Sequence, residues 1–312
     1  MASQNSLNKS SNAVFKEFYS KLQDPKSEEI RQLFERFVQK GFKTKAPREE
    51  MAQQIREIVE LMFENFADVW KIRSKIILEG MEALVTKNLY KLIRLRRESE
   101  IMENEILEKK MKIIGSFIKP EHLDIDPKRL SSARIERAVS ELSKMNKFKT
   151  PRDKMVLIMN ACKVIGLMLK ETAKPGAADG ADMFFPSIIY ILLKGAPKDV
   201  KANIDFIKLY RNPELLGSED DYFITTMTSA IEFISNMIGD DLNIEKSEYS
   251  DLYNKFSGEK DREVEEEAER RAHHRREQGY DDFENQSDVS IMTTQTSAQL
   301  IGELQSLDVP IF

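Results

Sequence analysis

Cysteine and histidine are scarce in this sequence, and this limits the chemistry that the chain can support. Cys162 is the only cysteine among 312 residues, so no internal disulfide can form. The three histidines are His122, His273 and His274, and no segment carries two of them at metal-ligand spacing with a third ligand nearby. We therefore expect neither a disulfide framework nor a metal site.

Glycine-rich phosphate loops and catalytic triads are also missing. Gly176 and Gly180 are followed by neither the Lys-Ser/Thr pair nor the further glycines that nucleotide-binding loops require. No histidine, carboxylate and nucleophile combine into a plausible set for covalent catalysis. These absences argue against a hydrolase, a kinase or a redox enzyme, and they predict no cofactor.

Long hydrophobic runs and basic stripes are absent as well. No run approaches the roughly 18 apolar residues of a membrane span, and the polar residues 1–12 lack the apolar stretch of a signal peptide. Lys and Arg number 48 against 53 Asp and Glu, a net charge of -5, without a basic stripe interleaved with aromatic residues. We expect a cytoplasmic protein with no nucleic-acid partner and only peripheral membrane association.

Apolar residues recurring at helical spacing dominate the first part of the chain. Residues 1–13 are rich in Ser and Asn and are predicted to be a disordered leader. From residue 14 to residue 118 the apolar stripes predict successive helices, with Gly80 as a candidate interruption and Pro120 as the end. This part is predicted to form an antiparallel helical bundle.

Residues 119–257 continue the helical pattern and are predicted to form a second domain. Thr150-Pro151-Arg152-Asp153 combines an N-cap residue with proline in the first turn, and the helix that follows is apolar on most sides, as a central helix should be. Another helix is predicted to open at Asp182, after a Gly- and Ala-rich break. No alternating strand pattern competes, so the predicted fold class is all-α.

The composition changes after Gly258. Residues 259–276 are dense in charge, and we predict that 258–312 form a linker and tail without fixed structure for the most part. An alternative is that apolar residues near the end form a short amphipathic segment that binds an adaptor or docks on the chain's own core; they are Ile291, Leu300, Ile301, Leu304 and Leu307.

The pattern around Asp182 is more specific than helix formation requires, and it resembles a known family. The residues that carry the resemblance are Thr150-Pro151-Arg152-Asp153-Lys154, Ala181-Asp182, Phe184, Pro186, Ile189-Tyr190, Leu193-Lys194, Pro197, Asn203-Ile204, Asn212-Pro213, Asp221-Tyr222, Thr225, Phe233, Tyr253 and Ser257-Gly258. Over more than a hundred residues they are similar to the VPS-nine domain of guanine nucleotide exchange factors of the Rabex-five type.

The resemblance implies a layered all-helical domain preceded by a helical bundle, and a function in endosomal trafficking. Family members bind Rab GTPases of the Rab-five subfamily and accelerate release of their GDP, so the resemblance also implies recruitment to early endosomes. Some members carry a cysteine-rich ubiquitin-binding finger, which one cysteine excludes here. A different class of function stays open: a catalytically inert helical Rab-binding adaptor or scaffold that kept the fold without exchange.

The resemblance assigns roles to four residues. Asp182 is implied to be the catalytic acid, which competes with the nucleotide phosphates for a lysine of the GTPase; from the residues alone it would be a helix N-cap. Pro186, Tyr222 and Thr225 are implied to bind the GTPase. Read without the family, Pro186 is a helix-start residue, Tyr222 a buried tyrosine with a bonded hydroxyl, and Thr225 a packed methyl group.

Overall fold

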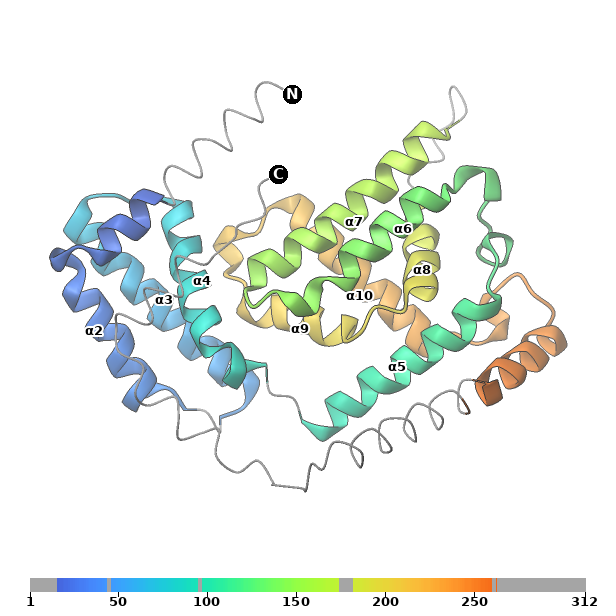
Figure 1. The fold of residues 1–312 in the computed structure, drawn as a ribbon, viewed down its shortest axis with the longest axis horizontal. Coiled ribbons are helices and arrows are strands. Elements are labelled where there is room, and N and C mark those ends of the chain that lie inside the picture. The colour runs from blue at the N-terminus through green and yellow to red at the C-terminus, as the bar shows by residue number, and fades with distance from the viewer. Residues whose placement is uncertain (1–15, 44–45, 95–96, 174–181, 260–261, 263–312) are drawn as a thin grey trace, which may run out of the picture.

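The computed structural model describes residues 16–43, 46–94, 97–173, 182–259 and 262, and all of its regular elements are helices (Figure 1). No β-strand occurs in these ranges, which confirms the all-α prediction. The predicted disordered leader and almost all of the predicted tail lie outside the described residues. Within the ranges given, no helix combines the length and the apolar character needed to cross a bilayer.

The N-terminal helices form one hydrophobic core. They are a helix of residues 16–23, then α2 (Glu28–Arg36), α3 (Arg48–Trp70) and α4 (Lys75–Ile93). Helix α3 ends at Lys71, which adopts a left-handed conformation with a φ of 54°. Ser74 then caps α4 by accepting a hydrogen bond from Ile76 N. The expected interruption at Gly80 does not occur, because Gly80 lies inside α4, where Phe18 packs against it. A Cβ on Gly80 would come within 2.6 Å of that ring.

The remaining helices build a second core. They are α5 (Glu98–Phe117), α6 (Ser132–Ser143), α7 (Pro151–Glu171), α8 (Phe184–Gly195), α9 (Val200–Tyr210), α10 (Ser218–Asn236) and a last helix of residues 246–259. Five short 3-10 turns join them, at Pro120–Leu123, Pro127–Arg129, Met145–Lys147, Pro213–Leu215 and Gly239–Asp241.

The boundary between the bundle and the second part was expected at residue 118, but it lies earlier in the chain, before α5. Helix α5 was expected in the bundle, but its buried residues, among them Met111 and Ile114, belong to the second core. The reason is a close helix crossing: a Cβ on Gly115 would lie 2.1 Å from the carbonyl oxygen of Leu193, so α5 can approach α8 only through a glycine. Hydrophobic spacing along α5 predicts only part of its buried face, since Ile101 and Ile106 are 40% and 61% exposed, and it does not predict the partner of that face.

Helix α7 is the centre of the second part, as its apolar sequence predicts. It contacts α6, α8, α9 and α10, and Figure 1 shows it running diagonally beside α6. Its start is the predicted one, since Pro151 is the first helical residue and the Thr150 hydroxyl accepts a hydrogen bond from Asp153 N at 3.2 Å. This helix therefore provides the fixed frame on which α8 and α10 are placed.

The two parts are joined by apolar and ionic contacts. Phe206 and Tyr210 of α9 are buried in the core of the bundle. Beside them, Arg211 is 4% exposed and binds two carboxylates of α4, Glu79 at 2.5 Å and Glu82 at 2.8 Å. Glu79 also pairs with Arg152 of α7 at 3.0 Å. Because Arg211 and Glu82 are buried and paired with each other, separating the two parts would leave unpaired ions in the interface.

Candidate functional site

Asp182 lies immediately before α8 and is exposed to solvent. The N-cap of α8 is Met183, whose side chain makes no capping hydrogen bond, so Asp182 is not the capping residue. Its carboxylate forms no hydrogen bond or ion pair with any residue that the structure describes. The N-cap interpretation is thus wrong for Asp182, which presents a negative charge with no partner among the described residues at the start of a buried helix. The other acid of this loop, Asp179, lies outside the described residues.

An aromatic cluster lies next to this helix start. The Phe184 ring stacks on the Tyr222 ring of α10, with ring centroids 6.1 Å apart and an angle of 19° between the planes. The ring centroids of Phe184 and Phe223 are 6.0 Å apart. Phe184 and Phe223 are buried, whereas Tyr222 is 55% exposed. The alternative of a buried core tyrosine is therefore wrong for Tyr222, which covers buried rings with one face and meets solvent with the other.

The aromatic cluster forms one wall of an open apolar groove of about 480 Å³. Residues of α7, α8 and α10 line it, among them Leu167 of α7, which is 48% exposed. Cys162 lies at its base, where burial raises the pKa of the thiol to about 12 and keeps it protonated. An apolar groove with an exposed leucine and tyrosine is suited to receive apolar side chains of another protein.

Charged side chains border the same groove. Lys163 of α7 pairs with Glu219 of α10 at 3.4 Å, and both line it, as does Lys170. Because the Lys163 and Glu219 side chains are about half exposed, this pair contributes little to stability. It is free to exchange its partner for a charge on a bound protein.

Pro186 and Thr225 lie near these elements but do not line the groove. Pro186 is partly buried in the first turn of α8, two residues after Phe184. Thr225 is exposed on α10, one turn after Tyr222, and so lies on a similar side of that helix. The structure thus places Tyr222 against Phe184, the first residue of α8, two residues after Asp182. Pro186 and Thr225 do not line the groove.

Several residues that line the groove had no functional role predicted from the sequence. Phe184 carried the resemblance without a function, and Leu167 and Phe223 had no predicted role. The doublet Tyr222-Phe223 contained a usable signal, since neighbouring helical residues point in directions about 100° apart, so two adjacent rings can scarcely both be buried. Leu167 had no such signal, because the sequence of a largely apolar helix does not show which of its residues is exposed to solvent.

The arrangement defines a class of protein before any comparison is made. It is an all-helical module with an open apolar groove, next to a helix start whose preceding carboxylate has no partner among the described residues. Within the described ranges no cluster of His, Cys, Asp and Glu could hold a metal ion. Residues 135–238 match the family model of the Vacuolar sorting protein 9 (VPS9) domain, and this segment contains Asp182, the aromatic cluster and most of the groove. This segment of the chain is therefore similar to a VPS9 domain.

Individual relatives support the same family. The chain is 36% identical over 173 residues to vacuolar protein sorting-associated protein 9A of Arabidopsis thaliana, covering 55% of this chain and 33% of that protein. It is 32% identical over 184 residues to vacuolar protein sorting-associated protein vps901 of Schizosaccharomyces pombe, covering 55% and 32%. Identity to the human Rab5 GDP/GTP exchange factor is 26% over 206 residues, covering 62% and 41%. The similarity thus spans well under half the length of each of these relatives.

Proposed function

We propose that this chain is a guanine nucleotide exchange factor that accelerates GDP release from small GTPases of the Rab-five subfamily. The observation that carries the proposal is the free carboxylate of Asp182 beside an apolar groove, both within the segment that matches the VPS9 domain. One relative is named a Rab5 GDP/GTP exchange factor and others are named vacuolar sorting proteins. The proposed cellular setting is therefore endosomal trafficking, and the chain is proposed to associate peripherally with early endosomal membranes.

The groove is the proposed binding site for the switch segments of the GTPase. Leu167 and Tyr222 are large side chains left partly exposed, and covering them removes apolar area from water. The ring of Tyr222 is already held by its stacking on Phe184, so little side-chain freedom is lost on binding. Thr225 and Pro186 extend this contact surface along α10 and α8 in the proposed complex.

Asp182 is the proposed catalytic acid, acting on the partner GTPase. A GTPase holds GDP through Mg²⁺, a phosphate-loop lysine and backbone N–H groups. A carboxylate inserted among these groups repels the nucleotide phosphates. It also pairs with the phosphate-loop lysine, so the nucleotide loses its contact with that lysine. Because Asp182 has no partner to give up among the described residues, the exchange factor loses no existing hydrogen bond when the acid is inserted.

A nucleotide-release assay across a panel of Rab GTPases tests the proposal. Release of a fluorescent GDP analogue should accelerate strongly for Rab-five-type GTPases and little for other Rabs. The competing function, a helical Rab-binding adaptor or scaffold without exchange activity, makes the opposite prediction: stable binding to a Rab with no change in its GDP release rate.

A further inference from the structure

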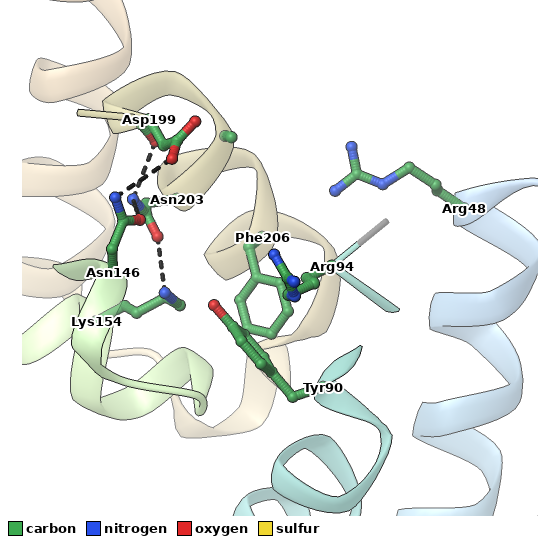
Figure 2. A pocket seen from close by; sticks show the side chains of 9 residues that line it. Arg48, Tyr90, Arg94, Asn146, Lys154, Asp199, Asn203 and Phe206 are labelled. Atoms are coloured by element: carbon green, nitrogen blue, oxygen red, sulfur yellow. Dashed lines mark hydrogen bonds between the residues drawn. The ribbon is translucent and has the colours of Figure 1, made fainter. Parts of the chain in front are cut away.

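A second, smaller pocket lies where the bundle meets the second domain (Figure 2). It has a volume of about 50 Å³ and is lined from α3, α4, α7 and α9 and from the turn before α7. Its polar lining residues are Arg48, Arg94, Asn146, Lys154, Asp199 and Asn203. None of them belongs to the groove at Tyr222, so this pocket has no part in the function proposed above.

Lys154 is a buried cation without a carboxylate among its hydrogen-bond partners. It is 1% exposed, and its ammonium donates to the Met145 carbonyl oxygen at 2.8 Å and to Asn203 Oδ1 at 2.7 Å. The rings of Tyr90 and Phe206 lie 5.4 and 5.5 Å from the same nitrogen. These neutral partners only partly replace water, and burial lowers the pKa of Lys154 to about 8. A bound anion would compensate this charge.

Two arginines reach the same pocket from the bundle side. Figure 2 shows Arg48 extending from its helix toward the pocket, with Arg94 beside Tyr90 and Phe206. Arg48 pairs with Glu100 at 3.0 Å through one terminal nitrogen, but its Nε is buried and makes no hydrogen bond in the described chain. A buried N–H left without an acceptor is costly, and an acceptor in the pocket would remove that cost.

The charged residues that line the pocket leave a positive surplus, because Arg48, Arg94 and Lys154 face one lining carboxylate, Asp199, which accepts a hydrogen bond from Asn146 at 3.3 Å. Two carboxylates act from outside the lining: Glu100 pairs with Arg48, and Asp153 attracts Lys154 while it also pairs with Arg152 at 3.7 Å. The donors come from opposite sides, which suits a tetrahedral oxyanion, and arginine is the side chain whose fork best matches phosphate. The small volume admits a single phosphate group, with whatever carries it remaining outside.

We propose that this pocket binds a phosphate group, held by Arg48, Arg94 and Lys154. A ligand held from both sides links α3 and α4 of the bundle to α7 of the second domain, so it stabilises their association by mass action. The phosphate belongs either to free inorganic phosphate or to the headgroup of a phosphorylated inositol lipid, and the same chemistry recognises both.

Isothermal titration calorimetry of the full chain with inorganic phosphate tests this site. Arg94→Gln is the main variant, because Arg94 is exposed and its loss should leave the fold intact; Arg48→Gln is the second. Lys91→Gln is the matched control, since it removes one positive charge from the same helix at an exposed position that does not line the pocket. We expect saturable binding that weakens about tenfold or more in each arginine variant and is unchanged in the control.

Parallel titrations identify the source of the phosphate. Tighter binding of a soluble inositol phosphate than of inorganic phosphate, together with Arg94-dependent binding to phosphatidylcholine vesicles containing a phosphoinositide, supports a lipid headgroup. Equal affinity for both soluble probes, without vesicle binding, supports free phosphate. The proposal is overturned if neither soluble probe binds saturably up to about 10 mM, or if both arginine variants bind as well as the Lys91→Gln control.

Discussion

Replacing Asp182 by asparagine separates the charge of this residue from its shape. Asp182 is exposed, does not cap α8 and has no hydrogen-bond or ion-pair partner in the described parts of the chain. Surface substitutions of this kind change stability by less than about 0.5 kcal/mol. Asp182→Asn should therefore leave the melting temperature and the apolar groove unchanged, so that any loss of activity reports on the charge alone.

The expected loss of activity follows from the contact that the charge is proposed to make. A carboxylate about 4 Å from an ammonium group gains about 4 kcal/mol at an effective dielectric constant of 20. Preorganised charged contacts of this type are typically worth about 2–4 kcal/mol in the rate-limiting state, or roughly 30- to 1000-fold in rate. Asp182→Asn should slow GDP release from the partner Rab by a factor in this range.

The assay is release of a fluorescent GDP analogue from a Rab-five-type GTPase, with binding to the nucleotide-free GTPase measured in parallel. Asp179→Asn is the control, because it removes the other acid of the same loop and should change little. If Asp179→Asn abolished release while Asp182→Asn did not, the acid was assigned wrongly. Near-normal release with both variants would refute acidic insertion for this protein.

Three further predictions follow from burial and charge. Tyr222→Ala should lower affinity for the GTPase while shifting the melting temperature by only a few degrees, because the ring is 55% exposed; a large drop in melting temperature would contradict an interface role. Arg211→Met should cost about 3–5 kcal/mol of unfolding free energy in urea titrations, since it leaves buried carboxylates unpaired, whereas Lys246→Met, which breaks a pair with a 78% exposed lysine, should cost under about 1 kcal/mol. Stability should rise with pH between about 8 and 10.5 through Lys154, because in this window the unfolded chain binds the proton that the folded chain has lost. Lys154→Met should remove that rise, up to about 3 kcal/mol, in denaturation curves measured across this window.

The fold class and several helix boundaries could be predicted from local sequence. Thr150 and Pro151 mark the start of α7 because capping and proline placement depend only on neighbouring residues. The apolar periodicity of α7 likewise predicted a central helix. In these cases the physical cause lies within one turn of the residue, and a single sequence contains it.

Predictions that depended on distant partners were less accurate. Helix α5 was assigned to the bundle, because nothing in its own spacing reveals the crossing of Gly115 over the carbonyl of Leu193. Gly80 was expected to interrupt a helix, whereas Phe18 makes it a packing site. Lys154 would ordinarily be assigned to the surface, and its burial depends on a hydrogen bond to Asn203, a residue of α9.

The candidate site was predicted in part. The sequence pattern named Asp182 and Tyr222, and the structure places them at the start of α8 and beside Phe184, which explains why one is free and the other exposed. The part of the groove that Leu167 lines could not be predicted, because exposure of one residue in a largely apolar helix depends on which neighbours cover it. The catalytic role of Asp182 and the binding roles of Pro186, Tyr222 and Thr225 all stay predictions.

Multiple-turnover exchange tests the central claim most directly. A small amount of the full chain is added to a large excess of a Rab-five-type GTPase loaded with fluorescent GDP, in the presence of free GTP. A true exchange factor should release nearly all of the labelled nucleotide, far more than one equivalent per chain, and faster in proportion to its concentration. Release at the intrinsic rate, or release that stops at one equivalent, would contradict the account and favour a Rab-binding adaptor.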